Sequence, residues 1–288
     1  MKAKMIYRPL TATPFKHNSA YQEIEPCRML QPYVRCFWGG TLYGSDTETD
    51  GQSGIVIPDT CVDIIYRMDD AGNIMTSDFI GINDRSFCTQ VDEKSGQRVS
   101  LFAIRFYAWS AYVFSEDSFT GTVNGRYDVR ERFGWLDREL RGRLTEPGNL
   151  TDRIRLAEAL LLKRIETARE KAVVDSVMND ILRYQGGLGI HQLSKENFIS
   201  GRQLERLFHE YIGITPKKLS NLVRYQCLWR DIVSQSHFNI MDAVQKYGYT
   251  DLSHLMREFE RYHSMNIRSA LELCAGTLHK EGMAAGSM

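Results

Sequence analysis

The first part of the chain shows the pattern of a β-rich domain. Two short runs, "GIVIPDTCVDIIYRM" and "RVSLFAIRFY", are dense in apolar, β-branched and aromatic residues and are bounded by Gly, Pro, Asp and Ser. Runs of this kind between turn-forming residues are typical of strands. We therefore predict a β-rich domain over residues 1–145.

Helical periodicity replaces this pattern from about Trp109. The segment "LTDRIRLAEALLLKRIETARE" repeats its apolar residues every three to four positions, as an amphipathic helix does. Its apolar stripe consists of Ile154, Ala157, Leu161 and Ile165. We predict that this helix, within residues 146–171, is a linker or a dimerisation contact.

Between residues 172 and 274 the chain shows only helical periodicity, interrupted by short segments that contain Gly. An all-helical domain is expected there, followed by a tail over residues 275–288. The predicted fold class is therefore α+β. It joins a β-rich domain, for which a cupin-like barrel is one expected form, to an all-α domain through a helical linker.

The same helix occurs twice in the helical part. A shift of 51 positions superimposes Leu204 on Leu255, Arg206 on Arg257, Phe208 on Phe259 and Tyr211 on Tyr262. A shorter helix is predicted before each copy, at about residues 190–197 and 240–247. A short helix, a tight turn and a second helix with one apolar and one polar face make a helix-turn-helix, whose second helix enters the DNA major groove.

Capping residues support both units. Ser200 with Gln203 three residues later predicts a capping box, and Thr250 followed by Asp251 predicts a weaker cap. Between the units, Thr215 and Pro216 begin a helix that reaches about Val233. Such a helix is about 28 Å long, comparable with the roughly 34 Å between successive major grooves on one side of DNA. One chain would thus reach two adjacent grooves.

The net charge of the chain says nothing about its partners, but the distribution of the charges along the chain does. The chain has 36 basic and 36 acidic side chains, but residues 199–230 hold six basic and two acidic ones. Exposed cations on a recognition helix indicate DNA contact, although a solvated helix face is the alternative. The predicted DNA-binding residues are Arg202, Gln203, Glu205, Arg206, His209, Ser253, His254, Met256 and Arg257. The predicted phosphate contacts are Thr215, Lys217, Lys218 and Arg224. For Gln203 and His254, capping or a surface role is an equal alternative.

These motifs resemble the AraC/XylS family of transcriptional regulators over residues 174–271. The resemblance is carried by "SGRQLERLFHEYIGITPKKL" and "DAVQKYGYTDLSHLMREFERY". It implies a sequence-specific regulator, an activator or a repressor, that binds double-stranded promoter DNA and contacts RNA polymerase. It also implies homodimers and a small-molecule effector. The second unit differs from the family pattern, which usually has Lys where Glu260 stands.

The front half resembles, more loosely, a sensor domain attached to this family, through "PDTCVDIIYRM" and "LFAIRF". That resemblance implies an effector pocket, without naming the effector. The candidate pocket residues are Trp38, Asp63, Tyr66 and Arg105. Core positions and buried ion pairs are common alternatives for such residues in apolar strands.

Enzyme and metal motifs are missing from the sequence. It contains no GxSxG, P-loop, HExxH or GxGxxG, and its six cysteines form no CxxC or CxxH pair. We therefore expect no enzyme activity, no cofactor and no metal. Two alternatives stay open: a thiol-reactive or DNA-repair-type sensor fused to a DNA-binding domain, and a regulator controlled by a partner protein. Without a signal-peptide pattern or a membrane-spanning run, we expect a cytoplasmic protein.

Overall fold

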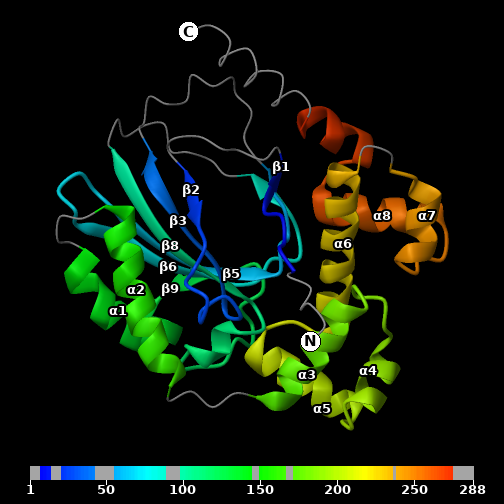
Figure 1. The fold of residues 1–288 in the computed structure, drawn as a ribbon, viewed down its shortest axis with the longest axis horizontal. Coiled ribbons are helices and arrows are strands. Elements are labelled where there is room, and N and C mark those ends of the chain that lie inside the picture. The colour runs from blue at the N-terminus through cyan, green and yellow to red at the C-terminus, as the bar shows by residue number, and fades with distance from the viewer. Residues whose placement is uncertain are drawn as a thin grey trace, which may run out of the picture.

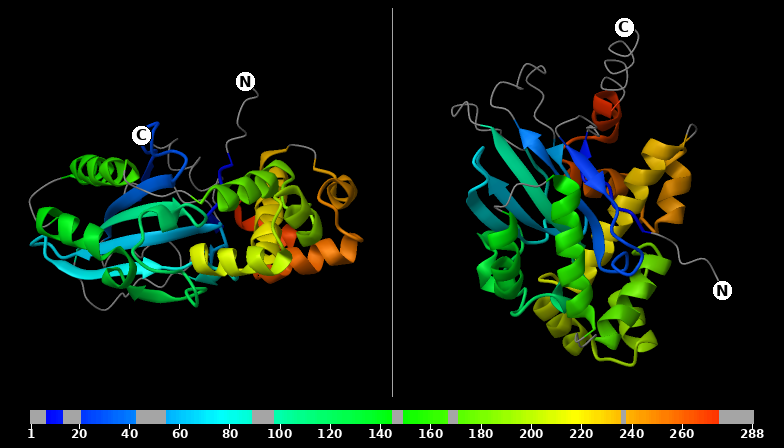
Figure 2. Two further views of the ribbon diagram at one scale, coloured as in Figure 1. Left: turned by 90° about the horizontal axis from the view of Figure 1, so that it is seen from below. Right: turned by 60° about the vertical axis from the view of Figure 1, so that its left-hand side comes forward.

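The computed structural model describes residues 7–13, 21–42, 55–88, 98–144, 149–166, 171–235 and 238–274. The predicted tail, residues 275–288, lies outside these ranges. Within them the chain forms a β-rich domain and a helical domain, which stand side by side in both views of Figure 2. The predicted α+β fold class is confirmed.

Antiparallel strands build the β-rich domain (Figure 1). The strands are β1 (Ala12–Thr13), β2 (Gln22–Ile24), β3 (Val34–Leu42), β4 (Ile55–Val56), β5 (Cys61–Met68), β6 (Ile74–Ile80), β7 (Phe87–Cys88), β8 (Val99–Tyr107) and β9 (Arg126–Asp128). Six of them form one sheet in the order β2-β3-β8-β5-β6-β9, and the other three form a small sheet, β1-β4-β7. The described strands thus form two sheets, and their pairing does not close them into one barrel.

Alternation along the strands gives the large sheet two different faces. On β5, Ile64 and Tyr66 point to one face, and Asp63 and Arg67 point to the other. The apolar face is covered by α1 (Arg130–Leu144) and α2 (Leu150–Ile165), which lie against the sheet in Figure 1. The strands β5 and β8 were predicted from the sequence, whereas β3, β6 and α1 were not.

The helix α2 is the one predicted as a linker or dimer contact. In its predicted apolar stripe, Ile154, Ala157 and Leu161 are buried and Ile165 is half-buried, and the helix packs on β3 and α1. At Gly39 in β3 the fit is so close that a β-carbon would lie 2.9 Å from Leu150 Cδ1. In this structure the stripe is therefore covered by the chain's own sheet, and α2 is part of the β-rich domain.

The helical domain consists of α3 (Ala172–Arg183), α4 (Ile190–Glu196), α5 (Gly201–Tyr211), α6 (Pro216–Ser234), α7 (Ile240–Lys246) and α8 (Leu252–His263). The pairs α4–α5 and α7–α8 are the two predicted helix-turn-helix units. The helix α6 has the 19 residues expected and runs between the two units in Figure 1. Its predicted start is confirmed, since Thr215 caps it and Pro216 occupies its first turn.

Caps define where the two recognition helices begin. At α5, the Ser200 hydroxyl accepts from the backbone N–H of Gln203, and the Gln203 side chain accepts from the N–H of Ser200, so the predicted capping box is confirmed. At α8 the cap is Asp251, whose carboxylate accepts from the N–H of His254. Asp251 rather than Thr250 therefore sets the start of the second helix.

The two domains are joined by direct contacts. The backbone N–H of Phe119 donates to the carbonyl of Glu210 at the end of α5, over 2.8 Å. On α6, the buried Gln226 side chain donates to the carbonyls of Leu10 and Pro58 at 2.9 and 2.5 Å. The loop after α5 approaches so closely that a β-carbon on Gly213, at φ 92°, would lie 2.8 Å from the Phe119 carbonyl oxygen. The β-rich domain thus holds the first unit at the C-terminal end of α5.

Candidate nucleic-acid interface

The first recognition helix, α5, presents the polar face that the sequence predicted. Arg202, Glu205, Arg206 and His209 are exposed, whereas Leu204 and Phe208 on the opposite side are buried. Neither Arg202 nor Arg206 forms an ion pair with another described residue, so both guanidinium groups are open to a ligand. Gln203 is also exposed, and its side-chain oxygen accepts hydrogen bonds from Ser200 as part of the capping box.

The second recognition helix, α8, is less open. Ser253 and Arg257 are exposed, but His254 and Met256 are half-buried. The ring of His254 packs edge-on against Tyr249, with the ring centres 5.3 Å apart. Of the four residues predicted on this helix, the structure therefore leaves two fully accessible.

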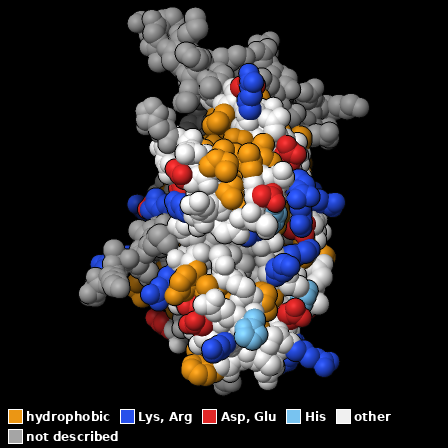
Figure 3. All heavy atoms as spheres, turned by 90° about the vertical axis from the view of Figure 1, so that its right-hand side faces the viewer, with side chains coloured by type: hydrophobic (Ala, Val, Ile, Leu, Met, Phe, Trp, Pro, Cys, Tyr) orange, Lys and Arg blue, Asp and Glu red, His pale blue; other side chains and the backbone are white. Residues whose placement is uncertain are grey.

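Charge separates the two units further. Residues 199–230 hold six basic and two acidic side chains, whereas residues 239–268 hold four of each. In the second unit, Glu260 is exposed and follows Arg257 by three positions, which places the two side chains on neighbouring parts of the helix surface. Figure 3 shows the side of the molecule that carries the helical domain, where basic side chains are interspersed with single acidic ones.

Two of the residues predicted to contact phosphate, Lys218 and Thr215, bind other groups of the protein instead. Lys218 Nζ lies 2.7 Å from the Asp84 carboxylate of the β-rich domain. Burial alone would raise the pKa of Asp84, but hydrogen bonds from Lys218 and Asn124 outweigh it and lower that pKa. Asp84 is therefore charged near neutral pH and holds Lys218. Thr215 is engaged in capping α6, and Lys217 remains exposed.

Arg224, predicted to contact phosphate, is bound to a carboxylate inside the helical domain instead. Its Nη2 atom lies 2.7 Å from Glu258 Oε2, and the two side chains are only 11% and 7% exposed. The Tyr249 hydroxyl donates to the same carboxylate at 2.9 Å, and the Tyr249 ring lies 4.4 Å from the guanidinium carbon. Burial by itself lowers the pKa of Arg224, but the charge of Glu258 more than compensates and raises it. Arg224 thus fastens α8 to α6 inside the domain.

The four candidate effector residues do not line a common pocket. Arg105 Nε lies 2.9 Å from Asp63 Oδ1, and Trp38 Nε1 donates to the same oxygen at 2.8 Å. Tyr66 lies on the opposite face of β5, buried against Phe102. The pKa of Arg105, which burial alone would lower, is raised by the nearby carboxylates of Asp63 and Asp59. Three of the four are therefore hydrogen-bonded to one another, with Arg105 buried and Trp38 and Asp63 half-buried.

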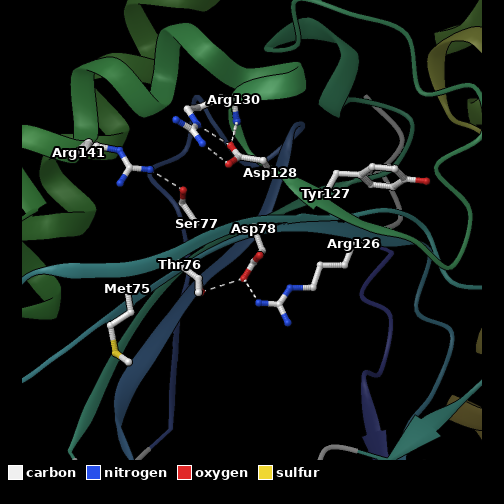
Figure 4. A pocket seen from close by; sticks show the side chains of 9 residues that line it. All are labelled: Met75, Thr76, Ser77, Asp78, Arg126, Tyr127, Asp128, Arg130 and Arg141. Carbon is white, nitrogen blue, oxygen red and sulfur yellow. Dashed lines mark hydrogen bonds and ion pairs between the residues drawn. The ribbon is translucent and has the colours of Figure 1, made fainter.

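A cavity of about 450 Å³ lies elsewhere in the β-rich domain, between β6, β9 and α1. Its lining includes Thr76, Asp78, Arg126, Asp128, Arg130 and Arg141, which surround it in Figure 4. Arg126 and Arg130 each bind one aspartate, Asp78 and Asp128 respectively. The Arg130 side chain and backbone N–H lower the pKa of Asp128 to about 2. The residues of this site come from three elements that only the fold brings together, so no local sequence pattern indicates it.

The cysteines bear on the thiol-reactive alternative. Cys36, Cys61 and Cys227 are buried, and burial raises the pKa of Cys36 to about 12 and that of Cys227 to about 11. A thiol that stays protonated is a poor nucleophile.

The described residues contain no group of three His, Cys, Asp or Glu side chains placed to hold a metal ion. None of the helices in the described ranges is long and apolar enough to span a membrane.

Two helix-turn-helix units joined by one long helix, attached to a β-rich domain, define the class of protein. Residues 193–272 match a family of helix-turn-helix domains, of the AraC type, and residues 22–123 match a domain of unknown function, DUF6597. Residues 193–272 therefore form a helix-turn-helix domain of the AraC type.

Solved structures with a similar arrangement include ToxT from Vibrio cholerae O395. It is 9% identical, with a TM-score of 0.37, over 90% of this chain and 100% of that one. Another ToxT structure from Vibrio cholerae is 10% identical, with a TM-score of 0.40, over 82% and 98%. A third, of wild-type ToxT with bound unsaturated fatty acid, is 10% identical, with a TM-score of 0.37, over 88% and 95%. Among curated proteins, none matches the chain.

Proposed function

We propose that the protein is a sequence-specific DNA-binding transcription regulator. The observation that carries the proposal is the free cationic face of α5, with Arg202 and Arg206 exposed and unpaired among the described residues, on a helix of an AraC-type domain. Exposed arginines on a recognition helix bind guanine edges and phosphates. The second unit, set off by the 19-residue α6, would enter the next major groove.

The two units have unequal roles in this proposal. The first unit supplies most of the affinity, because its patch is basic and its two arginines are free. The second unit, with equal numbers of charges of each sign, mainly sets the register on DNA. Its Arg257 and Ser253 are the residues expected to contact the second groove.

The decisive experiment uses Arg206→Ala. An arginine bidentate to guanine contributes about 1–3 kcal/mol of discrimination, so affinity for the operator should fall about 5- to 150-fold. Affinity for random DNA should change far less, and thermal stability should stay the same, because the side chain is exposed. Arg183→Ala, which removes an exposed arginine from α3, is the matched control. Equal losses on operator and random DNA would make Arg206 a phosphate contact, and no loss on either would refute the proposed interface.

The finer part of the proposal concerns regulation. We infer that a small organic anion binds the cavity between β6, β9 and α1 and changes DNA binding. Arg126, Arg130 and Arg141 border this cavity, and arginine is the side chain best suited to carboxylates and phosphates. Tyr127, which also borders it, donates a hydrogen bond of 2.7 Å to the carbonyl of Gly121. Gly121 belongs to the loop whose Phe119 contacts the end of α5, so the cavity and the first unit share one segment.

Thermal shift of the full chain tests this inference. Small mono- and dicarboxylates and sugar phosphates should raise the melting temperature of the wild type, because a ligand that binds only the folded state stabilises it. Arg130→Ala should abolish the shift, whereas Arg35→Ala, remote from the cavity, should not. The partners in this proposal are promoter DNA, RNA polymerase, the anion and a second copy of the chain. If no anion shifts the melting temperature, control by a partner protein becomes the better hypothesis.

A further inference from the structure

Phe198 stands out on the surface of the helical domain. It occupies the turn between α4 and α5, and its side chain is 98% exposed. Its backbone has a φ of 51°, in the left-handed region that favours glycine. The residue thus combines an unfavourable backbone conformation with an aromatic ring that is almost fully exposed within the part of the chain that the structure describes.

The second unit shows what the turn alone requires. There, Gly248 occupies the same place after its first helix, with a φ of 67°. Glycine adopts this conformation without steric cost, because it has no β-carbon. The fold of the turn therefore explains a glycine at this position and does not explain the phenylalanine at position 198.

The position of Phe198 along α5 suggests its use. The C-terminal end of α5 is held by the β-rich domain, through Glu210 and Thr120, whose hydroxyl donates to the His209 carbonyl at 3.2 Å. Phe198 lies at the other end, two residues before the Ser200 cap. In helix-turn-helix proteins, this N-terminal end of the recognition helix contacts base edges. The ring is therefore placed beside the groove that Arg202 would enter.

We propose that Phe198 contacts the methyl group of a thymine in the first major groove and so helps select that base. The proposal rests on the DNA-binding function proposed above. The exposed residues on either side of Phe198 in the chain, Lys195, Glu196, Ser200 and Arg202, are polar, so the ring is not part of an apolar patch suited to a protein partner. A single ring does suit a single methyl group, and phenylalanine is one of the side chains that recognise thymine in this way.

The test removes the two contacting groups separately. An operator is first selected from random duplex DNA with the full-length wild type. Each thymine is then replaced in turn by deoxyuridine, which lacks only the methyl group. Wild type should lose about fourfold in affinity at one or two thymines, the worth of one buried methyl. Phe198→Gly should bind the thymine operator at least fourfold more weakly than wild type and show no further loss at those positions.

Controls separate this inference from the function on which it rests. Phe198→Gly should melt about 1–3 °C higher than wild type, because glycine relieves the left-handed backbone, so weaker DNA binding cannot come from misfolding. Met29→Ala, which removes another exposed apolar side chain, 69% exposed on the β-rich domain, should keep the wild-type pattern. The proposal for Phe198 is overturned if Phe198→Gly binds as tightly as wild type or keeps the same losses with deoxyuridine. If the wild type selects no sequence at all, the proposed function is overturned as well.

Discussion

The ion pair between Arg224 and Glu258 should stabilise the protein without contacting DNA. The two side chains are 2.7 Å apart at their closest and almost fully buried, and they join α6 to α8. Arg224→Met removes the charge and keeps most of the side-chain volume. Among the described residues, the buried Glu258 carboxylate then keeps only the hydrogen bond from the Tyr249 hydroxyl. Removing one partner of a buried pair costs about 3–5 kcal/mol.

That loss has a measurable size in this chain. Unfolding entropy is about 2.1 cal/mol/K per residue, so for 288 residues the melting temperature should fall by about 5–8 °C. The double variant Arg224→Met/Glu258→Met should recover most of the loss, because an apolar pair of similar volume replaces the ion pair. Arg183→Met, an exposed arginine on α3, is the matched control and should melt within about 1 °C of wild type.

DNA binding distinguishes this role from a phosphate contact. We expect Arg224→Met to leave the slope of log affinity against log salt unchanged, and the double variant to bind DNA like wild type. A phosphate contact would show the opposite pattern, a slope reduced by about one unit at an unchanged melting temperature. That result, measured by calorimetry and by salt titration of operator binding, would refute the reasoning from burial.

Three further predictions follow from other charged groups. Asp84→Asn should release Lys218, tighten binding to any DNA and steepen the salt slope by about one unit, at a stability cost of about 0.2–1 kcal/mol. Because the pKa of Asp84 is lowered in the fold, the stability difference between wild type and Asp84→Asn should vanish as the pH falls through this pKa. An unchanged salt slope for Asp84→Asn would exclude Lys218 as a phosphate contact. Glu260→Lys should likewise tighten binding and steepen the slope, and Arg206→Ala should cost more affinity than Arg257→Ala; the reverse order would show that α8 docks differently from α5. Burial lowers the pKa of His263 to about 4, so the neutral ring is stable in the fold while the unfolded chain gains a proton near pH 6.5. Stability should therefore fall as the pH drops from about 6.5 to 4, and His263→Gln should flatten that dependence in pH-resolved denaturant unfolding; an equally steep dependence would assign it to other groups.

The helical domain could be predicted from the sequence because its signals are local. A helix is encoded by apolar residues three and four positions apart and by its caps, so Ser200 with Gln203 and Thr215 with Pro216 located α5 and α6 to within a residue. The repeat at 51 positions then showed that the same unit occurs twice. One error was also local: Asp63 and Tyr66, three residues apart in a strand, must point to opposite faces and could not share a pocket.

Tertiary structure decided which charged side chains are exposed and which form ion pairs. Arg224 and Lys218 look like solvent-facing cations in the sequence, yet Glu258, 34 positions away, and Asp84, 134 positions away, neutralise them. The cavity between β6, β9 and α1 likewise exists only once three separate segments meet. The sequence specifies which face of a helix is apolar, because the residues of that face recur every three to four positions along the same helix. It does not specify which distant carboxylate lies opposite a given cation, because that pairing depends on how whole elements pack. The amino-acid sequence thus determined the two recognition helices and the length of the helix between them. Packing within the helical domain and against the β-rich domain determined which cations of the helical domain are left free.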